Sequence, residues 1–461
     1  MSAIEREARP APLSGMMTPA TLRQWVEEGL IKTVLPVLPD MTTALRGKRL
    51  PANSVIDRLD GSSKAPTLME ACAYLFATDV DMTPSDAYPL SGWHSGFKDM
   101  TAVADLGAIR VMRPGTVLVH CDAVQPDGQP VEEAPRRVLA RQLQRLADRH
   151  GLEVKVGLES EVVLHTRSRR RPIFEHNSDY ALNHGRNLAE FFPRLERALD
   201  IAATPVESVK TEGAAGQIEV AFPYGPALRA CDDYSVYKHL LRQVASEHHM
   251  VPTFMAAPAT GTGSGLHLHV SLWDQDDAPV FATDDPGKLP PTMEHTIAGL
   301  LTVLPELMPL LAPTPNSYRR YQPHSFAPTH FTWGIDNRTC AVRVTGHGRG
   351  IHLEVRIPGA DANPYLALAA VCAAIEAGLR HEMIPPAART GDSYHENSSK
   401  AATPIPRDII SATVAFENSA VARDAFGADV VRHYATAAHQ EHGALEYLVP
   451  DTEINRYHER V

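Results

Sequence analysis

The chain between residues 263 and 273 reads Gly263-Ser-Gly-Leu-His-Leu-His-Val-Ser-Leu-Trp273. Side chains of a β-strand point alternately to opposite faces, so this pattern predicts a strand with one aliphatic, packed face. The other face would carry two imidazoles and a hydroxyl, from His267, His269 and Ser271. A single buried histidine is more often a core residue than a functional one. What these histidines do therefore depends on what the neighbouring strands carry.

Two carboxylates share one face of a second predicted strand, between Val154 and Leu164. Glu159 and Glu161 are two residues apart and so point the same way. Carboxylates this close repel each other unless a cation lies between them or one keeps its proton. Because aliphatic residues follow at 162–164, the strand is expected to be covered on both sides rather than to form a solvated edge. The pair predicts a metal site or an acid/base pair.

Two further segments of the sequence also carry carboxylates in positions suited to a ligand. Glu212 and Glu219 flank a turn of glycine and alanine, whose small side chains let the backbone approach a ligand closely. Residues 351–358 alternate again, and their polar face carries His352, Glu354 and Arg356. Together the segments supply five carboxylates and at least one imidazole, with no thiolate. A ligand set dominated by oxygen suits magnesium or manganese, whereas zinc would be expected to use more histidine or cysteine.

Several arginines follow in the same part of the chain. Guanidinium groups bind phosphates and carboxylates through paired hydrogen bonds, so arginines beside a divalent metal favour phosphoryl transfer. Each one alone is weak evidence, because most arginines lie on the surface. The candidates are Arg320, Arg338, Arg343, Arg349 and Arg356.

These segments resemble the glutamine synthetase family and occur in its order. The matching pieces are Glu159-Ser-Glu161, Glu212 to Glu219, Gly263 to His269, Asn316-Ser-Tyr-Arg-Arg320, Asn337-Arg338 with Arg343, Glu354-Val-Arg356 and Asn363-Pro-Tyr365. The resemblance implies an α+β fold, with an N-terminal β-grasp domain and a C-terminal catalytic domain built on a curved antiparallel sheet flanked by helices. We expect disorder over residues 1–17, the β-grasp domain over 18–125, with a strand from Cys72 to Met82, and the catalytic domain over 126–461.

The resemblance also implies a role for each matching position. One metal would be held by Glu161, Glu212 and Glu219, and a second by Glu159, His267 and Glu354. The nucleotide would contact Glu207, His269 and Ser271, together with Arg338 and Arg343, which would also act in catalysis by neutralising the transferred phosphoryl group. Arg349 would be a weak match to a lysine near the nucleotide. Substrate glutamate would be held by Gly263, Arg320 and Arg356.

One departure from the family concerns the amine. Ammonia-using members read Pro-Gly-Tyr-Glu-Ala-Pro after the position of Arg320, and their glutamate helps to bind ammonium. This chain reads Pro323-His-Ser-Phe-Ala-Pro328, so Phe326 replaces that carboxylate. An apolar ring cannot hold a small cation but suits the carbon atoms of an organic amine. The second ammonium-site aspartate of the family stays open between Asp60 and the pair Asp79 and Asp81.

The implied activity is that of an ATP-dependent ligase. The γ-carboxylate of glutamate would take the γ-phosphate of ATP, and a primary amine would then displace phosphate from the γ-glutamyl phosphate. Neutral hydrogen-bonding groups beside Phe326 favour a short amine such as ethanolamine, with a polyamine next. A true glutamine synthetase and an inactive sensor or scaffold remain alternatives, as does, without the resemblance, a two-metal hydrolase. The implied cofactors are two or more Mg²⁺ or Mn²⁺ ions, and the implied assembly is a dodecamer of stacked hexamers.

Composition agrees with a large globular enzyme. The chain has 461 residues, 44% of them hydrophobic, which suffices for an extensive core and two or more domains. Its five cysteines include no closely spaced pair, which favours a reducing cytoplasm and no structural zinc. A net charge of −11 with no basic stripe argues against nucleic acid as a partner. Neither a leader nor a membrane span is expected.

Overall fold

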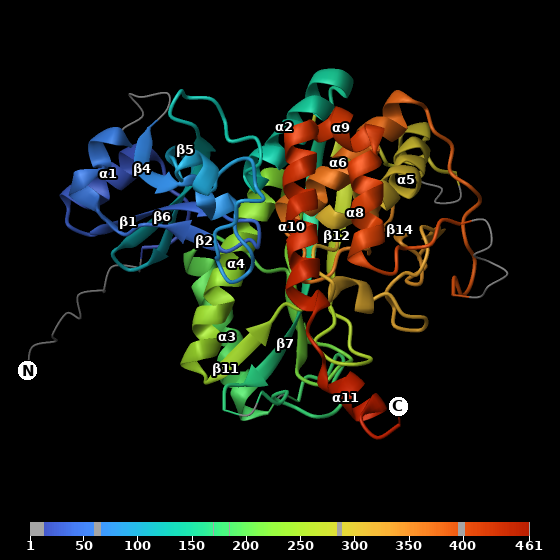
Figure 1. Ribbon diagram of the computed structural model, residues 1–461. Helices are drawn as coiled ribbons and strands as arrows, with labels where there is room; N and C mark the ends of the chain where they lie inside the picture. The colour runs from blue at the N-terminus through green and yellow to red at the C-terminus, as the bar shows by residue number, and fades with distance from the viewer. Residues whose placement is uncertain are drawn as a thin grey trace, which may run out of the picture.

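The computed structural model describes residues 13–59, 66–168, 170–183, 185–283, 288–394 and 402–460. The fold has two sheets. A smaller one near the N-terminus (blue in Figure 1) lies beside a larger one that helices surround. The expected α+β class, with an antiparallel catalytic sheet flanked by helices, is confirmed.

The N-terminal sheet is mixed. Its strands run in the order β2-β1-β6-β5-β4, with β3 also paired to β1. Only the pair β1 and β6 is parallel. The strands are β1 (Thr33–Pro39), β2 (Leu45–Gly47), β3 (Leu50–Pro51), β4 (Thr67–Cys72), β5 (Asp99–Arg113) and β6 (Thr116–Val124). Helix α1 (Pro19–Glu27) begins at Thr18, whose hydroxyl accepts a hydrogen bond from the Thr21 amide and so caps the helix.

Two expectations about this region are corrected. The strand predicted from Cys72 to Met82 ends at Cys72, and Ala73–Phe76 forms a 3₁₀ turn. The Ala73 amide donates to the carbonyl of Lys98, which bends the chain away from the sheet direction. Residues 13–17 are ordered rather than disordered, because Gly15 donates to Ile201 and Met17 to Ile109. Residues 1–12 lie outside the described part of the chain.

The larger sheet carries the segments that the sequence analysis singled out. Its strands run in the order β13-β14-β15-β12-β7-β9-β8, with β10 and β11 also paired to β7. All pairs are antiparallel except β13 with β14. The strands are β7 (Glu153–Thr166), β8 (Ser208–Thr211), β9 (Gln217–Ala221), β10 (Gly225–Pro226), β11 (Met250–Thr253), β12 (Leu266–Trp273), β13 (Trp333–Ile335), β14 (Val342–Thr345) and β15 (His352–Val355).

Strand β12 shows the predicted two-residue alternation. The side chains of Leu266, Leu268, Val270 and Leu272 are fully buried in the core. Strand β15 repeats the pattern, with Leu353 and Val355 buried. The hydrophobic face of the sheet thereby fixes the register, and the register puts the polar side chains of adjacent strands opposite each other.

Helices cover the larger sheet and pack on one another (Figure 1). Helix α6 lies against α2 and α5, and nearly all of its residues are buried. Its N-cap is Asn363, and the Asn363 amide also donates to the carbonyls of Asp40 and Met41 beside the N-terminal sheet. The helices are α2 (Pro135–His150), α3 (Arg186–Ile201), α4 (Ala227–Glu247), α5 (Pro291–Val303), α6 (Pro364–Arg380), α8 (Ile409–Asn418), α9 (Ala420–Phe426), α10 (Ala428–Glu446) and α11 (Asp451–Tyr457).

A buried arginine joins the two parts of the molecule. Arg136 on α2 forms ion pairs with Asp105 and Asp122 of the N-terminal sheet and with Asp232 on α4. Tyr365 donates a hydrogen bond to the same Asp232 at 2.7 Å. Burial opposes ionisation of Asp232, but the neighbouring His120 and Arg136 outweigh it and lower its pKa to about 2. Across the described residues, no helix is long and apolar enough to span a bilayer.

Candidate active site

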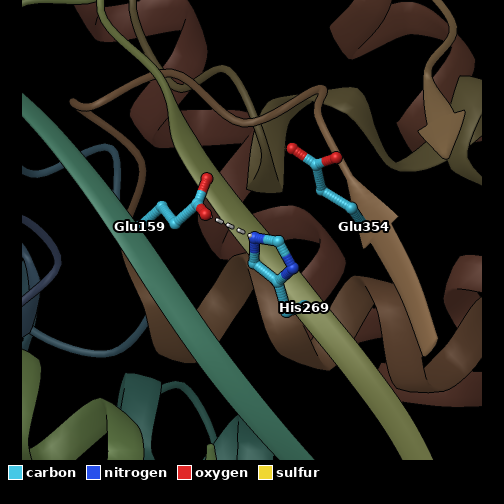
Figure 2. Close-up of side chains that lie close together, drawn as sticks. All are labelled: Glu159, His269 and Glu354. Atoms are coloured by element: carbon cyan, nitrogen blue, oxygen red, sulfur yellow. Dashed lines mark ion pairs between the residues drawn. The ribbon is translucent and has the colours of Figure 1, made fainter. Parts of the chain in front are cut away.

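Four strands bring the predicted metal ligands to one face of the larger sheet. Glu159 and Glu161 lie on β7, Glu219 on β9, the two histidines on β12 and Glu354 on β15. Pairing places His267 opposite Glu159 and His269 opposite Glu354. Figure 2 shows the side chains of Glu159, His269 and Glu354 lying close together from these three strands.

The first cluster consists of Glu161, Glu212 and Glu219, which can place ligand atoms within 4.8 Å of one another. The Gly265 amide holds Glu161 at 2.8 Å. Burial and the nearby carboxylates, Glu159 first among them, raise the pKa of Glu219 to about 8. Lys210 contacts Glu212 and lies 3.7 Å from Glu219, so it offsets only part of the repulsion. The cluster is arranged for a positive charge at its centre.

The second cluster contains Glu159, His269 and Glu354, again within 4.8 Å. His267 adjoins it, because its Nδ1 lies 3.3 Å from Glu159 and 3.5 Å from Glu354. Burial opposes ionisation of Glu159, yet His267 and His269 beside it hold its pKa well below the usual range. Burial is likewise outweighed at Glu354, where Arg356 and the histidines lower the pKa to about 2. Both carboxylates are therefore ionised at neutral pH, as a cation site requires.

Both clusters fit divalent cations. The donors are mainly carboxylate oxygens with a minority of imidazole nitrogens, which suits magnesium or manganese. One nitrogen, Nε2 of His269, is buried and has no hydrogen-bond partner. It lies 3.1 Å from a carboxylate oxygen of Glu159. A buried nitrogen this close to a carboxylate oxygen needs a cation or a proton between the two atoms.

A cavity of about 380 Å³ opens beside the second cluster. It is lined by Glu159, Glu207, His269, Ser271 and Arg343, all expected near the nucleotide or metal, and Arg349 stands at it as well. Arg343 donates to Glu354 at 2.9 Å and to Asp336. Arg338 is exposed and lies outside the lining.

The sequence analysis gave no role to three residues that line this cavity. Tyr224 and Trp273 stack with their ring centres 6.1 Å apart, and Lys155 lies 3.6 Å above the Trp273 ring. Such a pair offers an apolar platform for a flat ring. The sequence could have pointed to Trp273, because the two-residue alternation puts it on the same face of β12 as Ser271. Its indole N–H donates to the Ser271 hydroxyl at 2.9 Å. The third is His352, whose pKa burial lowers, so that its ring is neutral at neutral pH.

The residues expected to hold glutamate lie beside the second cluster and outside the lining of the cavity. Arg320 is buried and donates to the carbonyls of Arg356 and Ile357. Arg356 in turn donates to Glu354 and to the carbonyl of Phe326. A side chain at Gly263 would meet Arg320 at 3.3 Å, so the glycine leaves room for that arginine. Arg320 and Arg356 are therefore linked by hydrogen bonds to Glu354 of the second cluster.

Phe326 stands at the rim of this region. Its φ is 59° and its side chain is 66% exposed, while its carbonyl accepts from Arg356. His324 also has a positive φ of 63°, so the backbone of this turn is strained at two positions. Asp79 lines a separate cavity of about 510 Å³ between the N-terminal region and α4 and α10. Asp60 lies outside the described residues, so the choice of aspartate stays open.

Comparison with known proteins agrees with this arrangement. The glutamine synthetase catalytic domain matches residues 132–457. The chain belongs to the glutamine synthetase family. It is 37% identical to gamma-glutamylethanolamide synthetase GlnA4 of Streptomyces coelicolor, over the full length of both chains.

Other relatives in the glutamine synthetase family include enzymes named for organic amines. The glutamate–isopropylamine ligase of a Pseudomonas species is 29% identical, over 95% of this chain and 97% of the relative. A solved structure of the GmaS/ADP complex, in its first conformation, superposes with a TM-score of 0.82 at 25% identity. That match covers 96% of this chain and all of the other. The family resemblance expected from the sequence motifs is thereby confirmed.

Proposed function

We propose that this chain is an ATP-dependent ligase that joins the γ-carboxyl of L-glutamate to a short primary amine. Three observations support the proposal. Two clusters of metal-ligand residues adjoin a cavity with an aromatic platform, and buried arginines adjoin the second cluster. Phe326 stands where ammonia-using family members carry a glutamate. Of the relatives described above, one is named for an ethanolamide product and one for isopropylamine as the substrate.

The proposal gives each residue a task. Divalent cations would be held by Glu161, Glu212 and Glu219 and by Glu159, Glu354 and an imidazole, and would supply positive charge beside the phosphates. Tyr224 and Trp273 would hold the adenine ring by stacking. Arg320 and Arg356 would bind substrate carboxylates, and Arg338 and Arg343 would neutralise charge on the phosphoryl group.

The chemistry follows in two steps. The γ-carboxylate of glutamate attacks the γ-phosphorus of ATP, the bond to ADP breaks, and γ-glutamyl phosphate forms. A neutral amine then attacks the γ-carbonyl carbon, phosphate leaves, and the amine loses a proton. Water must be excluded between the steps. Because Phe326 is exposed in a single chain, we propose that a neighbouring copy covers it and completes the amine pocket in a homo-oligomer.

The test is phosphate release by purified protein with ATP, Mg²⁺ and glutamate. The amines are ammonium, ethanolamine, isopropylamine, putrescine and spermine, with each product identified by mass. We expect turnover with ethanolamine or isopropylamine at least tenfold above that with ammonium. Preferred turnover with ammonium would make the protein a glutamine synthetase despite Phe326. No turnover with any amine would favour a sensor or scaffold.

A variant ties the amine preference to one residue. Phe326→Glu restores an anion at the position of the family's ammonium-binding glutamate, so we expect the ratio of ammonium to ethanolamine turnover to rise about tenfold or more. Phe326→Leu keeps an apolar side chain and serves as the matched control. An unchanged amine profile in the glutamate variant would refute the assignment of Phe326 to the amine pocket.

A further inference from the structure

The amine turn, residues 323–328, carries Phe326 and has a strained backbone. His324 and Phe326 have positive φ angles of 63° and 59°, a region that residues other than glycine rarely adopt. Inside the turn, the Ala327 amide donates to the Ser325 hydroxyl at 3.3 Å. Strained backbone of this kind persists only where surrounding contacts fix it. Contacts that reach the turn from outside therefore determine where the Phe326 ring lies.

Two consecutive carbonyls of the amine turn accept hydrogen bonds from side chains outside it. Arg356 donates to the carbonyl of Phe326 at 3.3 Å, and the Tyr394 hydroxyl donates to that of Ala327 at 2.8 Å. The Tyr394 ring also lies against the His324 ring, with the ring centres 5.3 Å apart. Since Arg356 is assigned to the substrate, Tyr394 is the contact that can be removed without changing a residue of the site.

Tyr394 is itself held by the loop between β13 and β14. The side-chain amide of Asn337 donates to the carbonyl of Gly391 at 2.8 Å. The Ser393 amide donates to the Thr339 hydroxyl at 3.0 Å, and the Ser393 side chain is buried. Burial raises the pKa of the Tyr394 hydroxyl, so this group keeps its proton and remains a donor at neutral pH. A fixed donor thus meets the strained turn.

We infer that Tyr394 is a positioning residue for the amine: it holds the amine turn, and thereby fixes the Phe326 ring where that ring contacts a short organic amine. The hydroxyl acts through the backbone of the turn and does not itself touch the amine. The inference deepens the proposed function. It rests on that function for the identity of the amine, though not for the hydrogen bond that holds the turn.

Hydrogen–deuterium exchange followed by mass spectrometry tests the hydrogen bond on the whole protein without substrates. Tyr394→Phe removes the hydroxyl and keeps a ring against His324. We expect amides of the amine turn to exchange about three- to tenfold faster in this variant, the range typical for loss of one hydrogen bond. Tyr434→Phe is the matched control, because it removes a tyrosine bond to the carbonyl of Glu133, outside the amine turn and the candidate site. It should leave exchange of the turn unchanged.

Steady-state kinetics then tests the consequence for the amine. With the amine that the wild type prefers, we expect Tyr394→Phe to raise the KM for that amine about three- to tenfold. The KM values for ATP and glutamate should stay within about twofold of the wild type, because only the Phe326 side of the site loses its support. Circular dichroism checks the fold of both variants.

Several results would overturn the inference. Unchanged exchange of the amine turn in Tyr394→Phe would show that the hydrogen bond does not hold it. Equal rises in KM for amine, ATP and glutamate, or the same rise in Tyr434→Phe, would show a general structural role. Turnover with no amine would overturn the proposed function and the part of the inference that concerns the amine. The exchange measurement would still decide whether Tyr394 holds the turn, so the two failures are distinguishable.

Discussion

The pKa of the Glu219 carboxyl depends on the charged side chains around it. Burial and repulsion from Glu159, Glu212 and Glu161 raise the pKa of its carboxyl to about 8, so the group holds a proton at pH 7 in the absence of a cation. A divalent ion that binds the cluster must displace this proton, because the ligand is the carboxylate. Ion binding and proton release are thereby coupled at one residue.

We expect Mg²⁺ or Mn²⁺ binding to release close to one proton from Glu219 at pH 7 and almost none at pH 9. Proton release falls as the pH rises because of the raised pKa of Glu219: its carboxyl carries the proton below about pH 8 and has lost it above that pH. Calorimetry in buffers of different ionisation enthalpy measures the release. Glu219→Gln should abolish this contribution, whereas Glu153→Gln, at an exposed glutamate that begins the neighbouring strand β7, should not. Equal release by both variants would contradict the assignment.

Among single residues, most of the candidate site could be predicted from the sequence, because the spacing of neighbouring residues was enough to identify them. Glu159, Glu161 and His267 sit on strands whose two-residue period could be read directly. Tyr224 was missed because it lies outside any alternating run and meets Trp273 only when strands far apart in sequence pair. His352 was recognised as polar but given no task, since its partner His269 is 83 residues away.

Among the elements, helix α6 depends strongly on its first residue. The Asn363 side chain accepts from the Tyr365 amide and donates to the carbonyls of Asp40 and Met41. It therefore caps a buried helix and also fastens that helix to the segment after β1. A buried cap with three hydrogen bonds contributes more than an exposed one.

We expect Asn363→Ala to lower the free energy of unfolding by about 2–4 kcal/mol, through a lost cap and two carbonyls without partners. Denaturant unfolding followed by circular dichroism measures the loss. Asn418→Ala removes an exposed hydrogen bond at the end of α8 and is the control, with an expected loss below about 1 kcal/mol. Similar losses in the two variants would show that the buried bonds of Asn363 are not what stabilises α6.

Elements were predictable where one period dominated. The strand β12 could be predicted directly from its two-residue alternation. The expected strand from Cys72 to Met82 was wrong, because an apolar run fits either a strand or a buried turn. The hydrogen bond from the Ala73 amide to the Lys98 carbonyl favours the turn. A contact with a residue 25 positions away leaves no trace in the local pattern.

For the molecule as a whole, Lys238 marks the junction between the two parts. It lies on α4, is almost fully buried, and donates to the carbonyl of Thr42 beside the N-terminal sheet. Burial, together with repulsion from Arg242, lowers its pKa to about 7. The unfolded chain therefore binds one more proton than the folded protein between about pH 7 and the ordinary lysine pKa near 10.5.

We expect the melting temperature of the wild type to rise relative to that of Lys238→Met as the pH increases from 7 to 9. The sign is positive because stability rises with pH wherever the unfolded state binds more protons. Thermal melts at several pH values measure the difference. Lys48→Met, at an exposed lysine, should track the wild type. A constant difference between the wild type and Lys238→Met would show that Lys238 does not lose its proton in this range.

The pairing of β12 with β7 and β15 has a consequence for the cell's quality control. His267 and His269 meet their glutamate partners only in one register, and the same register buries the leucines of β12. A slip by one residue would turn the histidines inward and the leucines toward water. A misaligned copy would therefore be inactive and would also expose apolar surface. Chaperones and proteases that recognise exposed apolar surface would remove it without sensing activity at all.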